Sequence, residues 1–276
     1  YNQNEFLLKG DLLNAKEREQ YDAVRPDMKN EEAEVAVRAL MGYLSRYYGK
    51  KVIVLLDEYD TPLQEAYANG FWEEMSMFIR SMFHSMFKTN PYLERAMLTG
   101  ITRVSKESIF SDLNNLQVVT TTSCIYENAF GFTEDEVFAA LKEAGILDRQ
   151  EQVKAWYDGF TFGKSRDIYN PWSITKYLDE KRFAAYWANT SSNNLVSNLI
   201  REGASDVKIA MEDLIEGKSI EKVIDEEIIF EQLDDNSEAI WSLLLAAGYL
   251  KVEDVTAADN GEDAVYRLSL NNLEVR

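Results

Sequence analysis

Residues 51–60 read Lys51-Val52-Ile53-Val54-Leu55-Leu56-Asp57-Glu58-Tyr59-Asp60, an apolar run rich in β-branched residues that ends in acids. An apolar run without polar interruption predicts a strand that is buried on both faces, as in a parallel sheet flanked by helices. Open α/β sheets bind ligands at the carboxyl ends of their strands. The sequence therefore predicts that Asp57 and Glu58 lie at a ligand site.

These acids have two interpretations, and both can hold at once. Asp-Glu after a buried strand is the Walker B arrangement of P-loop nucleotidases, in which one carboxylate holds Mg²⁺ and the next polarises the attacking water. In the other interpretation the acids only end a strand and begin a helix. Asp60 is then the N-cap, and Thr61-Pro62 are the first helical residues.

Composition and charge exclude several classes of protein. The chain has 276 residues, 46% of them hydrophobic, so it can form one large or two medium domains with a substantial core. The net charge of −19 repels phosphate backbones, which argues against direct nucleic-acid binding by this chain. Cys124 is the only cysteine and His84 the only histidine, which excludes a disulfide framework and a multi-histidine zinc site. The sequence shows no signal peptide and no apolar run long enough to span a membrane, so we expect a cytoplasmic protein without a membrane partner.

Helical periodicity and turn residues predict the elements around the first strand. Helices are expected over residues 5–18, 31–48, 61–69 and 71–88, and a second buried strand over residues 95–99, closed by Gly100. His84 lies in the Met- and Phe-rich part of the last of these helices, where it is expected to be a core or half-buried residue. Two buried strands joined by a helical crossover predict a parallel pair with a right-handed connection. The fold class is therefore α/β, with a partial P-loop-type parallel sheet flanked by helices.

Thr99 ends the second strand, as Asp57 and Glu58 end the first. A polar residue at this edge of a P-loop sheet senses the γ-phosphate of the nucleotide, although a threonine that ends a strand is also ordinary. Arg103 and Lys106 follow in the next loop and are the nearest cations that could reach a phosphate. Either of them can equally be a solvated surface charge.

The second half of the chain is expected to be mainly helical. Residues 118–122 are a β-branched strand candidate, and Thr133 with Glu136 forms a capping box that begins a helix ending before Gly145. Further helices are expected to begin at residues 170–171, 191–192 and 205–206. We place a domain boundary near Gly131, which gives a partial ATPase-like core of residues 1–131 and a helical lid region of residues 132–276.

The last part of the chain predicts a winged-helix-like unit. Within residues 237–250 a short apolar helix ends at Gly248, and strands over residues 249–253 and 264–268 follow it. The recognition surface of a DNA-binding winged helix is basic, whereas this segment is rich in acids. Packing or protein contact is therefore favoured over DNA binding. The acids are Glu253, Asp254, Asp259, Glu262 and Asp263.

A nucleotidase also needs a phosphate-binding loop, and the motif G-x-x-x-x-G-K-[ST] does not occur in this sequence. The nearest match, residues 159–165, is one residue short, places two phenylalanines in the loop and follows a helical segment instead of a strand. Glu216-Gly217-Lys218 gives the E-x-K of two-metal nucleases, but it is expected at a helix end, so we attribute it to chance. We expect the phosphate loop upstream of Tyr1, in a longer protein of which this chain is a part.

An ordered set of motifs extends over nearly the whole chain. They are Val54-Leu55-Leu56-Asp57-Glu58-Tyr59-Asp60-Thr61-Pro62, Leu98-Thr99-Gly100-Ile101-Thr102-Arg103, Lys106-Glu107-Ser108-Ile109-Phe110-Ser111, Leu113-Asn114-Asn115-Leu116, Phe130-Gly131-Phe132-Thr133, Trp156-Tyr157-Asp158-Gly159, Tyr169-Asn170-Pro171-Trp172-Ser173, Tyr186-Trp187, Asn189-Thr190-Ser191-Ser192-Asn193 and Gly248-Tyr249-Leu250. This set resembles the bacterial AAA-ATPase-like proteins, which often carry a PD-(D/E)XK nuclease-like domain at the C-terminal end.

The resemblance implies a P-loop ATPase core that uses Mg²⁺ and ATP, followed by a helical and winged-helix region. It implies that Asp57 is the Mg²⁺-binding acid, Glu58 the water-activating acid and Thr99 the sensor, with Arg103 as the arginine that follows the sensor. The expected partner besides ATP is another protein or an adjacent nuclease-like domain. Because the Walker A motif has no counterpart here, we expect the isolated chain to be inactive as an ATPase.

The alternative is a non-hydrolysing interaction or regulatory module on a degenerate ATPase scaffold. The acidic composition and the missing phosphate loop favour this alternative.

Overall fold

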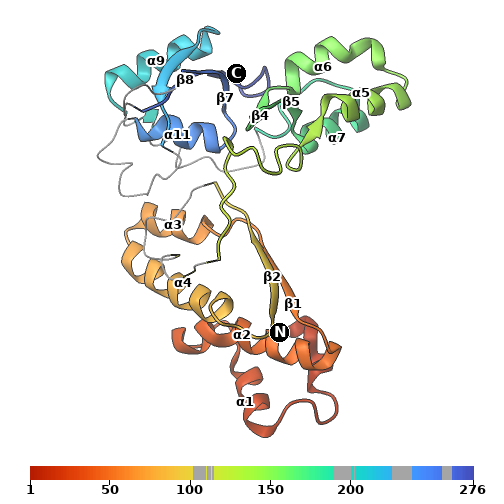
Figure 1. The fold of residues 1–276 in the computed structure, drawn as a ribbon, viewed down its shortest axis with the longest axis vertical. Coiled ribbons are helices and arrows are strands. Elements are labelled where there is room, and N and C mark those ends of the chain that lie inside the picture. The colour runs from red at the N-terminus through yellow and green to blue at the C-terminus, as the bar shows by residue number, and fades with distance from the viewer. Residues whose placement is uncertain are drawn as a thin grey trace. The chain divides into compact units, whose positions relative to one another are not determined.

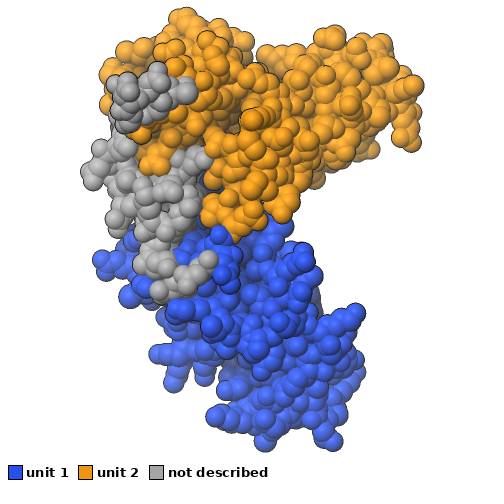
Figure 2. Space-filling model, viewed as in Figure 1, with its two compact units in different colours: residues 1–116 blue, residues 117–276 orange. Residues whose placement is uncertain are grey.

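The computed structural model of the protein describes residues 1–101, 110, 113, 115–188, 200–201, 203–225, 238–256 and 263–276. The chain forms two compact units, residues 1–116 and residues 117–276 (Figure 2). Each unit has hydrophobic clusters of its own.

The first unit consists of helices and a two-stranded parallel sheet (Figure 1). In chain order its elements are the 3-10 helix η1 (Asn2–Leu8), α1 (Ala15–Ala23), α2 (Asn30–Tyr48), β1 (Val52–Leu56), α3 (Thr61–Asn69), α4 (Trp72–Phe87) and β2 (Leu93–Leu98).

Helices α2 and α4 pack against each other and carry the core of this unit. Gly49 ends α2 in the left-handed conformation, with φ of 63°, which glycine adopts without a steric penalty from Cβ. Helix α4 buries Ile79, Phe83 and Met86, which recur at helical spacing. The Met- and Phe-rich stripe that the sequence shows is therefore part of the core.

The prediction of a single helix over residues 5–18 is wrong. The chain forms η1 and then begins α1 at Ala15. Asn14 caps α1 in a capping box: its side chain accepts a hydrogen bond from Glu17 N, and the Glu17 carboxylate accepts one from Asn14 N, both at 3.0 Å. Apolar spacing does not reveal this interruption, because Leu7 in η1 and Leu13 in the segment between the two helices belong to the same buried cluster.

The parallel pairing expected from the sequence is confirmed. Strand β1 pairs with β2 in parallel, with Leu55 opposite Met97 and Leu56 opposite Leu98. Helix α2 contacts β1, and α4 contacts β2. The unit is therefore α/β, with a small parallel sheet and helices.

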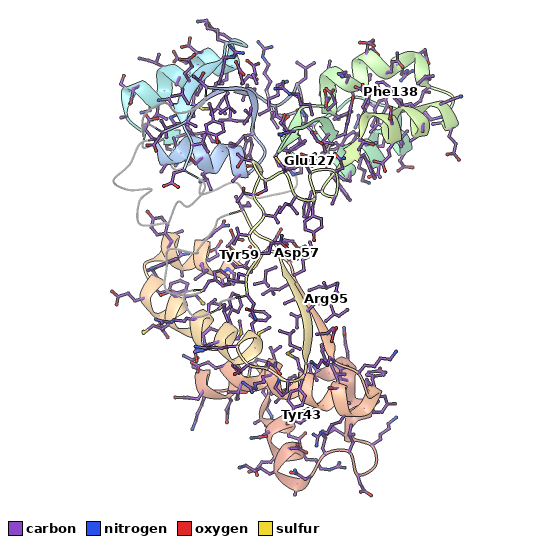
Figure 3. All side chains as sticks on the ribbon, viewed as in Figure 1. Tyr43, Asp57, Tyr59, Arg95, Glu127 and Phe138 are labelled. Carbon is purple, nitrogen blue, oxygen red and sulfur yellow. The ribbon has the colours of Figure 1, made fainter. Side chains whose placement is uncertain are left out.

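The expectation that β1 is buried on both faces is wrong for this chain. Burial alternates along the strand, and the side chains of Ile53 and Leu55 are 60% and 76% exposed. Met97, beside Leu55 on β2, is 47% exposed. A strand that is apolar on both faces needs a layer on each side. The remaining side chains of β1 are half-buried, and β2 is exposed from Glu94 to Met97, so the described residues cover one face of β1 only in part. Figure 3 shows Arg95, which pairs with Ile53 in the sheet register, on β2.

The second unit combines helices with two small antiparallel sheets (Figure 1). Its sheets have the strand orders β3-β5-β4 and β6-β8-β7. In chain order its elements are β3 (Phe132–Thr133), α5 (Glu134–Glu143), the 3-10 helix η2 (Leu147–Arg149), α6 (Gln150–Tyr157), β4 (Phe160–Phe162), β5 (Ser165–Tyr169), α7 (Pro171–Glu180), α9 (Ser205–Ile215), β6 (Ile220–Val223), α11 (Ala239–Ala246), β7 (Leu250–Thr256) and β8 (Val265–Leu270).

Local capping signals locate several of these helices correctly. The expected capping box of Thr133 and Glu136 is present at the start of α5. Asn170 accepts a hydrogen bond from Ser173 N at 3.1 Å and caps α7, which begins at Pro171. The helix expected from residues 205–206 is α9. The helix expected at residues 191–192 lies outside the described residues.

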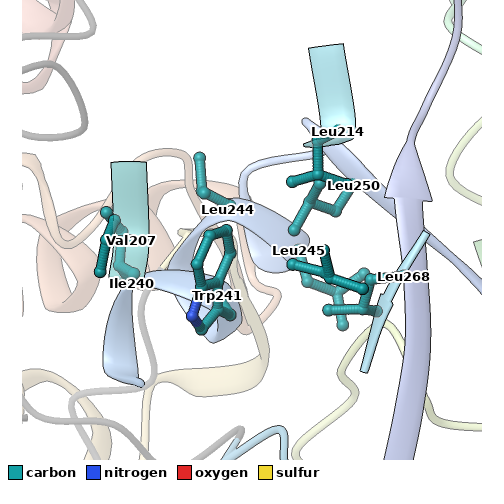
Figure 4. Packing of buried hydrophobic residues seen from close by; sticks show 9 residues of the cluster. Val207, Leu214, Ile240, Trp241, Leu244, Leu245, Leu250 and Leu268 are labelled. Carbon is teal, nitrogen blue, oxygen red and sulfur yellow. The ribbon is translucent and has the colours of Figure 1, made fainter. Parts of the chain in front are cut away.

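The C-terminal part of the second unit is organised around Trp241, whose side chain is fully buried (Figure 4). The expected last helix is α11, and the expected strand pair is confirmed as the antiparallel pair β7 and β8. Strand β6 adds a third strand that the sequence did not predict. The buried cluster around Trp241 draws on α9, α11, β6, β7 and β8 and consists of Val207, Leu214, Ile220, Ile240, Trp241, Leu244, Leu245, Leu250 and Leu268.

Two expectations for residues 117–131 differ from the structure. The prediction of a strand over residues 118–122 is wrong. Thr120 N donates a hydrogen bond to Ser123 Oγ at 2.9 Å, and the chain turns there. The compact units divide after Leu116, whereas we placed a boundary near Gly131. A Cβ on Gly131 would lie 2.3 Å from Ile168 Cγ2, so this glycine packs closely within the second unit.

No helix among the described residues is both long enough and apolar enough to cross a membrane.

Candidate functional site

Asp57 and Glu58 directly follow β1, which ends at Leu56, and both side chains are exposed. Figure 3 shows Asp57 beside the end of the strands. The backbone of Glu58 has φ of 50°, in the left-handed region that few residues other than glycine adopt. Such a conformation costs on the order of 1–3 kcal/mol and occurs most often at functional sites. Thr89, Tyr126, Asp167 and Lys181 share this conformation, so the backbone geometry supports a site at this turn only together with its acids.

Thr99 follows β2 and contacts both acids across the sheet. Its Oγ1 donates a hydrogen bond to Asp57 Oδ1, and Glu58 N donates to the same Oγ1 at 3.4 Å. The backbone continues the ladder, since Thr99 N donates to Leu56 O and Tyr59 N donates to Thr99 O, both at 2.9 Å. The structure thus brings together Asp57, Glu58 and Thr99, and their chemical roles stay predictions.

The oxygens of this site fit a magnesium ion that arrives with a phosphate ligand. The Asp57 carboxylate and the Thr99 hydroxyl lie side by side, and Mg²⁺ is usually held by one or two carboxylates together with water and substrate phosphates. In the part of the chain that the structure describes, no group of three or more His, Cys, Asp or Glu side chains could hold a metal by itself. Glu58 is exposed beside Asp57, where its carboxylate can contact a water molecule.

Asp60 has a different role from the helix cap that the sequence predicts. It precedes α3 as expected, but its side chain makes no capping hydrogen bond to that helix. Its Oδ2 instead accepts hydrogen bonds from Ile101 N, beyond the end of β2, and from Gln64 Nε2, both at 3.0 Å. The side chain is only 1% exposed. Sequence reasoning missed this role because the contact joins residues far apart in the chain.

The described residues place none of the other cations or loops suggested by the sequence at this site. Arg103 and Lys106 lie outside the described residues, so the structure does not locate them. Residues 159–165, which we rejected as a phosphate loop, include the tight hairpin between β4 and β5. Two backbone amides of this loop already have protein acceptors, since Gly163 N donates to Thr121 O at 2.8 Å and Lys164 N donates to Glu127 Oε2 at 2.9 Å.

The E-x-K residues at the end of α9 form local ion pairs. Lys218 Nζ lies 2.7 Å from Asp213 Oδ1 and 2.9 Å from Glu216 Oε2. The lysine is thus paired with acids from its own helix end, which agrees with the interpretation that this motif arises by chance.

A charged network in the second unit was missed by sequence reasoning. Lys154 on α6 contacts the Glu134 carboxylate, lies 3.1 Å from Asp167 Oδ1 and lies 4.0 Å from Asp158 Oδ2. Burial, followed by the charge of Asp167, raises the pKa of Asp158 to about 7. Burial also opposes ionisation of Asp167, but its hydrogen bonds with Lys154 and Asp158 outweigh this effect and lower the pKa of Asp167. These contacts link α5, α6 and β5, which is a structural role.

Fold and site together define an α/β protein with a cluster of acids and a hydroxyl at the carboxyl edge of a parallel sheet. Residues 6–110, which include β1, β2 and this site, match a protein-family model described as AAA-ATPase-like, "Predicted AAA-ATPase". This part of the chain is thus similar to the AAA-ATPase-like family, in agreement with the resemblance noted from the sequence.

A relative from Azotobacter chroococcum mcd 1 is also similar to this chain. It is described as an uncharacterized protein in the vnfD 5′ region and is 30% identical over 230 residues. The match covers 83% of this chain and 42% of the relative, so the chain spans less than half the length of the curated relative. No solved structure matches the chain at a significant level.

Proposed function

We propose that this chain supplies the Mg²⁺-binding and water-activating half of an ATP-hydrolysing site. The observation that carries the proposal is the hydrogen bond between Thr99 and Asp57, made where two adjacent parallel strands end. This edge of an open α/β sheet is where ligands bind. The family match over residues 6–110, which contains both residues, supports the same conclusion.

Each residue of the site has a defined task in this proposal. The Asp57 carboxylate binds the metal ion, directly or through water. Glu58 accepts a proton from the attacking water or orients that water, as a general base does. The Thr99 hydroxyl holds the Asp57 carboxylate in place and would sense the terminal phosphate. Mg²⁺ held by Asp57 would supply neutralisation of the phosphate charge.

The phosphate-binding loop belongs, in this proposal, to another segment of a longer protein. This chain has no G-x-x-x-x-G-K-[ST] motif. It also spans only 42% of the length of its curated relative, which leaves room for such a segment in a protein of that size. We refer to the longer protein that contains this chain as the full-length protein, and its predicted activity is a Mg²⁺-dependent ATPase. Arg103 remains a candidate for contact with the phosphates.

We further propose that the C-terminal part of the chain is a winged-helix-like unit that makes protein contacts. The element order α9, β6, α11, β7, β8 and the three-stranded antiparallel sheet support this assignment. Arg267 lies 3.6 Å from Glu253 and 3.3 Å from Asp254, so its charge is offset by neighbouring acids. The proposed partner is therefore a protein or an adjacent nuclease-like domain, since nucleic acid requires a basic surface.

The missing phosphate loop favours a second candidate, a non-hydrolysing interaction or regulatory module on a degenerate ATPase scaffold. Isothermal titration of the full-length protein with Mg²⁺-ATP, combined with a phosphate-release assay, separates the two. Binding accompanied by turnover supports the ATPase and ends the second candidate. Binding without turnover supports the second candidate, and the absence of binding overturns the ATPase proposal.

A further inference from the structure

We propose that Asp60 is a positioning residue, which fixes the end of β2 against the turn after β1 and so holds Thr99 beside Asp57 and Glu58. The inference rests on the proposed ATPase function for its catalytic consequence. The hydrogen bond between Asp60 and Ile101, on which the inference depends, lies within this chain and does not depend on the proposed function. Asp60 would act through its neighbours and not touch the substrate.

The Asp60 carboxylate is a second side-chain link between the two strand ends, besides the hydrogen bond from Thr99 to Asp57. Its Oδ2 accepts one hydrogen bond from its own helix, from Gln64 Nε2, and one from the segment after the other strand, from Ile101 N. Asp60 is 1% exposed. A buried carboxylate is tolerated only where hydrogen bonds or charges compensate for the lost water. Loss of these hydrogen bonds would leave a buried carboxylate with fewer partners, which costs free energy. Asp60 is therefore held in one position more firmly than a solvated helix cap.

Gly100 provides the space for this contact. A Cβ at Gly100 would lie 2.6 Å from Asp60 Oδ1, 2.9 Å from Asp60 Cγ and 2.8 Å from Tyr59 Cε1. Real Cβ atoms do not approach other atoms so closely, so a side chain at this position would push the carboxylate or the turn away. Glycine is required here for the close approach of two segments.

Thr99 lies between two fixed points. Its own backbone N donates to Leu56 O at 2.9 Å, and two residues later Ile101 N is bonded to Asp60. The residue between them, Gly100, has no side chain that could resist movement. Without the Asp60 contact, Thr99 keeps its bonds to Leu56, Tyr59 and the two acids, but the segment that follows it loses its link to the turn after β1. A displacement of about 1 Å in a catalytic group can reduce turnover by on the order of 10²-fold.

The kinetic test compares Asp60→Ala, Asp60→Asn and Gln64→Ala in the full-length protein, with Glu58→Gln as the reference. Asp60→Ala is expected to lower kcat roughly tenfold or more, with KM for Mg²⁺-ATP nearly unchanged, because the contact serves catalytic geometry. Asp60→Asn keeps an oxygen that can accept from Ile101 N and is expected to recover most of kcat. Gln64→Ala removes only the bond within the helix and is expected to leave kcat unchanged.

A second measurement follows the contact directly in the chain of residues 1–276. Hydrogen exchange at the Ile101 amide is expected to accelerate in Asp60→Ala but not in Gln64→Ala. Gly100→Ala, which keeps the carboxylate and its charge, is expected to displace it and to accelerate the same amide. This variant also gives a second kinetic test if Asp60→Ala does not fold.

Failure of the inference and failure of the proposed function give different results. If Glu58→Gln abolishes turnover while both Asp60→Ala and Gly100→Ala leave kcat unchanged, Asp60 is not a positioning residue and the ATPase assignment stands. If the wild-type full-length protein shows no turnover, the ATPase assignment falls, and the catalytic consequence of Asp60 falls with it. Unchanged exchange at Ile101 in Asp60→Ala would overturn the contact itself.

Discussion

Single carboxylates in this chain are in very different surroundings. Asp57 and Glu58 are exposed at the end of β1, whereas the Asp158 side chain is 12% exposed beside Asp167 and Lys154. Burial, followed by the Asp167 charge, raises the pKa of Asp158 from 3.8 to about 7. The folded state therefore binds more protons than the unfolded state between these two pH values. Through this group, the stability of the protein falls as pH rises across this range.

Asp158→Asn tests this pH dependence at one residue. Asparagine resembles the protonated carboxyl and carries no charge, so the variant is expected to gain melting temperature relative to wild type at pH 8. The gain is expected to shrink as pH falls below about 7, where wild-type Asp158 is protonated. Thermal unfolding followed by circular dichroism at pH 5 and pH 8 measures the difference. An equal difference at both values would contradict the assignment.

Asp167→Asn tests the other member of this pair. The pKa of Asp167 is lowered, so this group is ionised at both pH 5 and pH 8. The substitution removes its 3.1 Å contact with Lys154 at both values, and at pH 8 it also removes the repulsion between Asp167 and ionised Asp158. The variant is therefore expected to lose more melting temperature at pH 5 than at pH 8.

Helices and strands that carry local signals were predictable from the sequence, and those that depend on distant contacts were not. Thr133 with Glu136 and Asn170 with Pro171 begin helices in the structure as they do in the sequence pattern, because a cap involves only neighbouring residues. The strand expected over residues 118–122 is absent, although its β-branched residues favour one. β-Propensity describes single residues, whereas a strand also needs a neighbouring strand to pair with.

The candidate site was predictable in part for the same reason. Asp57, Glu58 and Thr99 could be placed together because parallel strands end at one edge of a sheet. The hydrogen bond between Asp60 and Ile101 could not be predicted, since it depends on how deeply the Asp60 side chain is buried. The sequence signal that could have found it is Gly100, which follows Thr99 directly.

The capping box of α5 gives a prediction for one element. Thr133→Ala removes the side chain that accepts from Glu136 N and is expected to cost about 1 kcal/mol of unfolding free energy. Ser205→Ala is the control, because Ser205 is the first residue of α9 and its N-cap is Ala204, which makes no side-chain cap. The control is expected to change stability by less than about 0.5 kcal/mol. Urea titration of both variants measures the difference, and equal losses would contradict the role of the cap.

The whole molecule consists of two compact units, and the first has an apolar sheet face that its described residues leave exposed. The sequence predicted burial of β1 on both faces. The structure shows one half-buried face on β1, because the described residues of this unit do not provide the full layers that a parallel sheet requires. Pattern alone shows that a strand is apolar on both sides, but it does not show whether the same chain supplies both layers.

Separate cores predict separate unfolding of the two units. Leu268 is fully buried in the cluster around Trp241, so Leu268→Ala is expected to cost about 2–5 kcal/mol in the second unit. Hydrogen exchange is expected to accelerate at buried amides of residues 117–276 and to stay unchanged in residues 1–116. Parallel acceleration in both units would show that they unfold as one.

The central claim is that Asp57, Glu58 and Thr99 form half of an ATPase site. The most direct test is the rate of Mg²⁺-dependent ATP hydrolysis by the full-length protein and its Glu58→Gln variant. Glu94→Gln, which changes an exposed acid on β2, is the matched control. We predict measurable turnover in the wild type and the control, and a loss on the order of 10²-fold or more in Glu58→Gln, because general-base help is removed. Turnover in Glu58→Gln equal to that of the wild type would contradict the account.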